Sequence, residues 1–256
     1  MPGPAAERAG SRSRPSIWCA AADARNPTPG RMGPEMIAES LQPQDVRWAM
    51  LLPLKPPGAA KSRLTLASGH LRTELVLAMA ADVAAVALAC PRVALVLVVA
   101  DSAEGLEPLQ RMGATVVVDP AGQGLNGSLR YAAGLVAARD HSYGIASLVA
   151  DVAAVTVDQL TRALDAAAAA GTAFVPDAAG RGTTFVGARQ WGSFLPEYGL
   201  HSRRLHVEAG FTELVLSDAA GLRLDVDTIT DLAAVSAIGA GPRTRAVLDQ
   251  IGGPLQ

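Results

Sequence analysis

Three aspartates of this 256-residue chain follow apolar segments in a pattern that suits a cation. Asp151 ends one apolar run, and Asp225 and Asp227 follow Leu222-Arg-Leu224. Residues i and i+2 of an extended segment face the same side, so Asp225 and Asp227 should converge on one point. These carboxylates and a third from a neighbouring strand form the hard-oxygen site that Mg²⁺ takes beside phosphates. Aspartate is also a favoured N-cap, so the alternative is that one of the pair caps a helix beginning at Ile229.

A basic loop follows the first apolar segment. Lys55, Lys61 and Arg63 lie close to Gly58 in a stretch that is expected to open a helix. Cations combined with the backbone N–H donors of a helix start suit a polyphosphate. A P-loop ATPase is excluded, because Ala60 stands where that motif requires a glycine before the lysine. The alternative interpretation is a solvated basic turn.

A glycine-rich turn follows a second apolar strand candidate. Gly122, Gly124 and Gly127 formally match the dinucleotide-binding fingerprint, and Asp151 would then bind the ribose. This match makes an NAD-dependent oxidoreductase the alternative enzyme class. Two features oppose it, because the fingerprint normally follows the first strand of the fold and Asp119-Pro120 lengthens the turn. Glycines in this place also suit a plain strand-to-helix connection.

Glycines and hydroxyl groups recur in Gly182-Thr-Thr184 and in the segment from Gly199 to Ser202. Glycines permit close backbone approach and hydroxyls donate to anionic oxygens, so these segments suit a phosphate or carboxylate ligand. Ser202 also suits the N-cap of the helix that follows it. The four histidines show no metal-ligand spacing, and we expect His206 on a helix surface rather than as a base.

Strand and helix patterns alternate along the chain. Strands are expected at 46–54, 93–99, 114–118, 145–149, 174–175, 184–186, 213–216 and 222–226, and helices at 69–90, 128–139, 157–170, 202–209 and 229–238. This alternation predicts an α/β fold with a doubly wound, mostly parallel sheet. Ligands of such sheets bind beyond the carboxyl ends of the strands, where the residues above are expected.

Composition limits the class of protein further. With 22 basic and 24 acidic side chains the net charge is −2, so we expect neither nucleic acid nor a membrane surface as a partner. Two distant cysteines, Cys19 and Cys90, fit a reducing cytoplasm. Residues 1–43 contain seven of the chain's 17 prolines and are expected to be a disordered N-terminal tail, which leaves 44–256 as the folded domain.

Six groups of short motifs occur in a characteristic order. They are Pro53-Leu-Lys-Pro56 with Ala60-Lys-Ser-Arg-Leu64, Gly124-Leu-Asn126, Ala150-Asp151, Pro176-Asp177 with Gly182-Thr-Thr184, Gly199 with Ser202-Arg-Arg204 and His206, and Asp225-Val-Asp-Thr228 with Asp231-Leu232. Over about 46–238 the chain therefore resembles the CofC/FbiD guanylyltransferases of coenzyme F-420 biosynthesis. The resemblance implies a Rossmann-like, MobA-type nucleotidyltransferase fold, a mostly parallel twisted sheet flanked by helices. It also implies that a phosphorylated three-carbon acid attacks the α-phosphorus of GTP and expels pyrophosphate.

The resemblance also assigns roles to residues. It implies that the nucleotide is bound by Lys55, Lys61, Arg63, Gly124 and Asn126, among which Lys61 and Arg63 are the catalytic groups. It implies that the acceptor is bound by Thr184, Gly199 and Ser202. The ligands of Mg²⁺ would be Asp151, Asp225 and Asp227. Members of the family commonly have proline where Ala153 stands, and its loss would loosen the turn that aims Asp151. The partners implied are GTP and the phosphorylated acid, and a homodimer is left open.

The acceptor remains open between two related acids. The alanine- and arginine-rich composition resembles that of actinobacterial members, whose acceptor is phosphoenolpyruvate, whereas the archaeal-type acceptor is 2-phospho-L-lactate. The phosphate of either acid is already an anionic nucleophile, which explains why the chain offers cations and carboxylates but no catalytic triad. Catalysis would then rest on positioning and charge neutralisation. A non-catalytic nucleotide-binding regulator is the third interpretation.

Overall fold

The computed structural model describes residues 42–54, 69–119 and 122–251. Within them lies a sheet of seven strands: β1 (Trp48–Leu54), β2 (Val93–Ala100), β3 (Thr115–Val118), β4 (Gly144–Leu148), β5 (Thr172–Pro176), β6 (Thr183–Ala188) and β7 (Thr212–Glu213). The strand order is β3-β2-β1-β4-β6-β5-β7, and β6 runs antiparallel to both of its neighbours. The other pairings are parallel. The predicted α/β fold with a mostly parallel sheet is confirmed.

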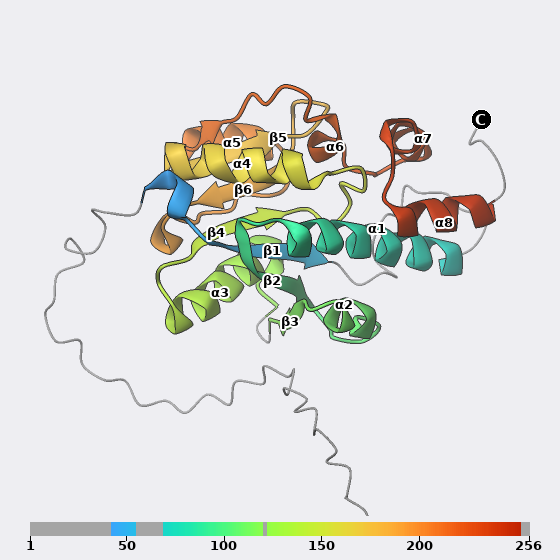
Figure 1. The fold of residues 1–256 in the computed structure, drawn as a ribbon, viewed down its shortest axis with the longest axis horizontal. Helices are drawn as coiled ribbons and strands as arrows, with labels where there is room; N and C mark the ends of the chain where they lie inside the picture. Colours follow the sequence, from blue (N-terminus) through green and yellow to red (C-terminus); the bar gives the residue numbers. More distant parts are fainter. Residues whose placement is uncertain (1–41, 55–68, 120–121, 252–256) are drawn as a thin grey trace, which may run out of the picture.

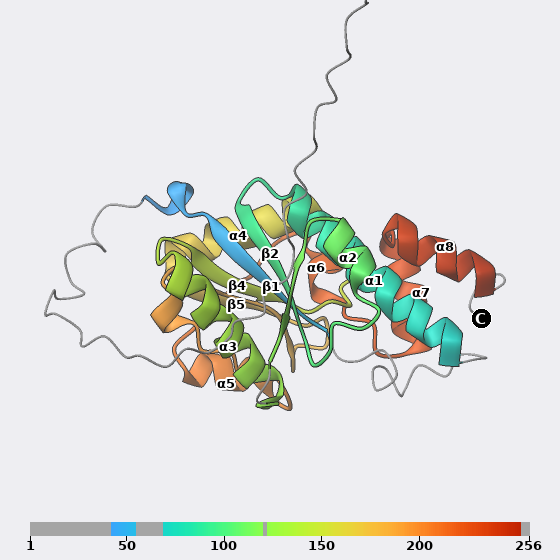
Figure 2. The ribbon, with the colours of Figure 1, turned by 90° about the horizontal axis from the view of Figure 1, so that it is seen from below.

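Helices cover both faces of the sheet. They are α1 (Gly69–Ala89), α2 (Glu107–Arg111), α3 (Gly124–Arg139), α4 (Val157–Ala170), α5 (Ser202–Glu208), α6 (Ala220–Arg223), α7 (Ile229–Ile238) and α8 (Pro242–Ile251), with short 3-10 turns at Pro43–Asp45 and Trp191–Ser193. Helices α1 and α4 lie on one face, and α3 and α5 lie on the other (Figures 1 and 2). Alternate residues of β1 therefore enter two separate cores, Met50 and Leu52 in one and Ala49 and Leu51 in the other.

The strand order reverses between β1 and β4, which are neighbours although β2 and β3 separate them in the chain. In open α/β sheets the ligand site lies outside the carboxyl ends of the strands at such a reversal. Asp151 follows β4 at this edge. The segment after β1 carries Lys55, Lys61 and Arg63, and all three lie outside the described residues.

Two expected strands near the carboxyl end of the domain were wrong. In place of a strand at 222–226 the chain forms the single helical turn α6, and β7 covers two residues instead of 213–216. The alternation in Leu222-Arg-Leu224 is too short to separate a strand from one helical turn with a buried side. A Cβ on Gly221 would collide with the carbonyl oxygen of Ala154 in the loop between β4 and α4, so a larger residue does not fit here without a shift. Helix α3 begins at Gly124, four residues before the expected start.

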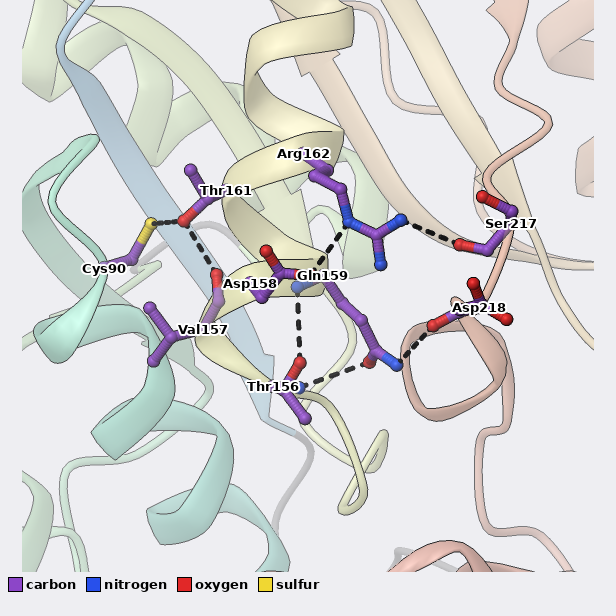
Figure 3. Close-up of polar contacts among 9 residues, drawn as sticks. All are labelled: Cys90, Thr156, Val157, Asp158, Gln159, Thr161, Arg162, Ser217 and Asp218. Carbon is purple, nitrogen blue, oxygen red and sulfur yellow. Dashed lines mark hydrogen bonds and ion pairs between the residues drawn. The ribbon is translucent and has the colours of Figure 1, made fainter.

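The start of α4 fastens the loop that leads into α6 (Figure 3). Thr156 and Gln159 form a capping box, and the Gln159 amide also donates to the Asp218 carbonyl at 2.9 Å. Arg162 donates to the Ser217 carbonyl at 2.8 Å. Asp218 has a φ of 53°, a strained value for a residue with a side chain, which these contacts support. The loop before α6 is thereby tied to the first turns of α4.

The last helix packs along α1. The buried Asp82 of α1 accepts hydrogen bonds from the N–H groups of Arg243 and Thr244, at 3.2 and 2.8 Å, and so satisfies donors in the first turn of α8.

No helix among the described residues is long and apolar enough to cross a bilayer. Of the predicted disordered tail 1–43, residues 1–41 lie outside the described residues, so that interpretation stays a prediction.

Candidate functional site

The loop after β4 and the segment after α6 meet beside the carboxyl edge of the sheet. The Val226 N–H donates to the Asp151 carbonyl at 3.3 Å, and Val226 is fully buried. Asp225 and Asp227 flank this anchored residue, so the structure brings the three predicted metal ligands into one region. Asp151 and Asp225 are half-buried, and Asp227 is exposed.

The three aspartates do not form a complete metal site on their own. Among the described residues no group of three histidine, cysteine, aspartate or glutamate side chains is placed to hold a metal ion. Mg²⁺ usually takes one or two protein carboxylates and fills its remaining positions with waters and substrate phosphates. The oxygen donors here fit such a shared site. The ligand set Asp151, Asp225 and Asp227 therefore stays a prediction that involves bound substrate.

The helix-cap alternative for Asp225 and Asp227 was wrong. Helix α7 is capped by Thr228, whose hydroxyl accepts from the Asp231 N–H at 3.2 Å. The Asp231 carboxylate accepts in return from the N–H groups of Thr228 and Asp227, at 2.8 and 3.1 Å. This reciprocal pair is a complete capping box. The aspartates on either side of Val226 therefore need an explanation other than capping.

Of the predicted acceptor residues, Gly199 and Ser202 meet at the start of α5, whereas Thr184 lies in β6. Ser202 is the first residue of this helix and is buried, and its N–H donates to the Gly199 carbonyl at 3.2 Å. The suggested N-cap role of Ser202 was wrong, since His201 takes the cap position with a φ of 63°. Thr184 is fully buried in β6, and its hydroxyl donates to the Val175 carbonyl at 3.5 Å.

The turn between β5 and β6 explains the Pro-Asp and Gly-Thr-Thr motifs. The Asp177 carboxylate accepts hydrogen bonds from the N–H groups of Arg181 and Gly182, both at 2.8 Å. A Cβ on Gly182 would lie 2.4 Å from the same carboxylate, so no larger residue fits without a shift. Arg203 of α5 donates to the Gly180 carbonyl at 3.0 Å. The turn before β6 is thus bonded to the first residues of α5.

His206 lies in the interior, so its expected surface position was wrong. Its Nε2 accepts from the Glu197 N–H at 3.0 Å, which leaves the proton of the neutral ring on Nδ1, 3.1 Å from the Thr183 hydroxyl. The ring stacks on Phe174 with centroids 5.3 Å apart. Burial disfavours the charged ring and lowers the pKa of His206 to about 4. His206 is therefore a neutral link between β6, α5 and the loop before Gly199.

Asn126, which the resemblance assigns to the nucleotide, is bonded to protein. Its Oδ1 accepts from the Tyr198 N–H at 2.9 Å, and its Nδ2 donates to the Tyr198 carbonyl at 3.0 Å. The Tyr198 hydroxyl lies 2.8 Å from the Ser147 hydroxyl of β4. Burial raises the pKa of Tyr198, and the negative charge of Asp151 raises it further. Tyr198 was not singled out from the sequence, although it directly precedes Gly199.

Gly124 ends a turn that is organised by Asp119. The buried Asp119 carboxylate accepts from the Gln123 N–H at 3.2 Å and from the Ser128 hydroxyl at 2.8 Å. Gly122 and Gly124 have φ values of 59° and 72°, which favour glycine. The turn follows β3, the edge strand of the sheet and two strands away from the reversal beside β1. A dinucleotide fingerprint belongs to the first strand, so the fold does not support the NAD-dependent oxidoreductase.

Solved structures with this architecture define the class of fold. A protein from Desulfovibrio desulfuricans G20 described as a nucleotide-diphospho-sugar transferase superposes with a TM-score of 0.61 at 19% identity, over 82% of this chain and 97% of its own. A 4-diphosphocytidyl-2C-methyl-D-erythritol synthase superposes with a TM-score of 0.51 at 18% identity, over 78% of this chain and 99% of its own. The chain has the fold of the nucleotidyltransferases.

Sequence comparison places the chain within that class. The family model described as "Guanylyl transferase CofC like" matches residues 48–255, and the chain belongs to this family. A phosphoenolpyruvate guanylyltransferase of Thermomonospora curvata is 42% identical over 212 residues, which cover 83% of this chain and 93% of the relative. One from Streptomyces coelicolor is 43% identical over 203 residues, which cover 79% of this chain and 96% of the relative.

The buried His206 makes stability depend on pH in one direction. Its folded-state pKa of about 4 lies below the ordinary 6.5, so the unfolded chain takes up the proton first as the pH falls. The contribution is present above pH 6.5 and is lost as the pH falls towards 4, by about 3 kcal/mol at 1.36 kcal/mol per pKa unit. Urea unfolding at several pH values should show this slope in the wild type and its loss in His206→Gln. The exposed His141→Gln should keep the slope, and an equal slope in His206→Gln would contradict the assignment.

Proposed function

We propose that this chain transfers GMP from GTP to the phosphate of phosphoenolpyruvate and releases pyrophosphate, as a cytoplasmic step of coenzyme F-420 biosynthesis. The observation that carries the proposal is family membership across residues 48–255, with relatives of about 40% identity that bear this activity as their name. The aspartates at the carboxyl edge of the sheet offer oxygen ligands for the Mg²⁺ that would balance the charge of the phosphates in such a transfer. The homodimer remains a prediction.

The reaction needs no protein nucleophile. An oxygen of the acceptor phosphate forms a bond to the α-phosphorus of GTP, the bond from that phosphorus to the bridging oxygen breaks, and pyrophosphate leaves with the electron pair. The chain's task is to hold two anionic substrates in line and to balance their charge. We assign that balance to Lys55, Lys61 and Arg63 of the segment that follows β1 in the chain, with Lys61 and Arg63 as the catalytic groups.

The described residues divide between the two substrates. Gly124, the first residue of α3, is proposed for the nucleotide, and Thr184, Gly199 and Ser202 are proposed for the acceptor. Asp151, Asp225 and Asp227 would hold Mg²⁺, which when bound neutralises phosphate charge. Val226, bonded to the Asp151 carbonyl at 3.3 Å, keeps the two aspartate segments side by side for this role.

Phosphoenolpyruvate is proposed over 2-phospho-L-lactate because the relatives from Thermomonospora and Streptomyces are named for it. The two acids carry the same phosphate and carboxylate and differ only at the carbons. Contacts that distinguish phosphoenolpyruvate from 2-phospho-L-lactate must therefore be apolar or steric, because both acids offer the same charged groups to the site.

Pyrophosphate release tests the proposed activity. We expect the full chain with GTP, Mg²⁺ and phosphoenolpyruvate to release pyrophosphate, to do so more slowly with 2-phospho-L-lactate, and to release none when the acceptor is omitted. A coupled assay that detects pyrophosphate measures all three conditions. Absence of turnover with GTP and either acid would contradict the proposal, and would leave a non-catalytic nucleotide-binding protein as the alternative.

Substitution of Asp225 or Asp227 tests the metal assignment. Asn keeps the shape of Asp and removes the charge, so we expect folding to be retained and turnover to fall about 100-fold, as on loss of one preorganised electrostatic contact. Raising the Mg²⁺ concentration should recover part of the rate. The control is Asp249→Asn on the exposed side of α8, which should match the wild type. Near-normal turnover of both variants at limiting Mg²⁺ would rule these carboxylates out.

A further inference from the structure

Side chains hold two consecutive peptide groups of the loop before α5. The Glu197 N–H donates to His206 Nε2 at 3.0 Å, and the Tyr198 N–H donates to Asn126 Oδ1 at 2.9 Å. These two side chains come from different helices, His206 from α5 and Asn126 from α3. The position of the loop backbone therefore depends on side chains from two helices, and the Asn126 contact spans 72 positions of the chain.

Asn126 contacts both polar groups of one residue. Besides accepting from the Tyr198 N–H, it donates through Nδ2 to the Tyr198 carbonyl at 3.0 Å, and 72 positions separate the two residues. Because its side-chain amide pairs with both the N–H and the carbonyl of Tyr198, Asn126 fixes the two peptide groups that flank this residue. The Tyr198 hydroxyl is fastened independently, 2.8 Å from the hydroxyl of Ser147 in β4. Tyr198 is thus held from the helix side and from the sheet side.

The residues that follow Tyr198 have unusual backbone conformations. Gly199 has a φ of 133° and His201 a φ of 63°, and the Gly199 carbonyl accepts from the Ser202 N–H at 3.2 Å. A left-handed conformation at a residue with a side chain costs free energy and persists only where the surroundings impose it. Loss of the support at Tyr198 should therefore let the segment from Gly199 to Ser202 relax.

We propose that Asn126 is a positioning residue for the acceptor rather than a ligand of the nucleotide. Its amide fixes the Tyr198 peptide and through it the backbone of Gly199 and Ser202. The inference rests on the proposed function, because it takes this segment to bind phosphoenolpyruvate. Since α3 begins at Gly124, the same helical turn then joins the nucleotide side of the site to the acceptor side. The Asn126 side chain therefore links the start of α3, proposed for the nucleotide, to the segment from Gly199 to Ser202, proposed for the acceptor.

Steady-state kinetics of Asn126→Ala separate the two roles. With each substrate varied in turn, we expect the KM for phosphoenolpyruvate to rise about tenfold or more, where each factor of ten corresponds to about 1.4 kcal/mol. The KM for GTP should stay within about twofold of the wild-type value, because a positioning role leaves the nucleotide contacts in place. The matched control is Arg139→Ala in the exposed last turn of α3, which should leave both constants unchanged.

Amide hydrogen exchange tests the same inference without turnover. In Asn126→Ala the Tyr198 amide and the 199–201 segment should exchange faster, while the Glu197 amide, held by His206, keeps its protection. A KM rise for GTP alone, or loop exchange equal to the wild type, would overturn the inference. Failure of the wild-type chain to turn over would instead contradict the proposed function. The exchange result would still decide whether Asn126 holds the loop.

Discussion

The antiparallel pairing of β6 with β4 is the constraint on which the rest of the site depends. Because β6 runs against its neighbours, its first residues lie where β4 ends, and the Val149 N–H donates to the Thr184 carbonyl at 2.9 Å. A parallel strand in the same place would carry Thr183 and Thr184 to the opposite edge of the sheet. The reversed strand instead puts the threonines beside the Asp151 loop, at the edge where the strand order changes direction and ligands bind.

Irregular segments at this edge are held by side chains in place of regular backbone pairing. Asp177 closes the turn before β6, His206 ties Thr183 to the Glu197 peptide, and Asn126 holds Tyr198. Backbone polar groups that leave water need partners, and a loop without ladder pairing must find them on side chains. Each of these polar groups therefore has a structural task that exists before any substrate binds. Preorganisation of this kind lets binding energy act on the reacting phosphates.

The sequence predicted the scaffold because its strands and helices follow from local patterns, whereas the assignment of the site residues stays a prediction. Apolar β-branched runs marked β2 and β3, and Asp151 was placed at a strand end correctly. The interior position of His206 and the hydrogen bonds between Asn126 and Tyr198 were not predictable, because both depend on contacts between segments far apart in the chain. Local ambiguity caused the other errors, because Leu222-Arg-Leu224 fits a strand and a single helical turn equally well. The roles of Lys55, Lys61 and Arg63 remain predictions that rest on the family motif.

In the proposed reaction the guanylyl group of GTP, which contains the α-phosphorus, moves to the acceptor, and the γ-phosphorus leaves in pyrophosphate. Two radioactive labels in parallel reactions with phosphoenolpyruvate and Mg²⁺ distinguish this reaction from transfer of the γ-phosphoryl group. With GTP labelled at the α-phosphorus, we expect the label in the guanylylated acid, and with GTP labelled at the γ-phosphorus, we expect it in pyrophosphate. Recovery of the γ-label as orthophosphate or on the acceptor, with the α-label left in GDP, would rule out guanylyl transfer.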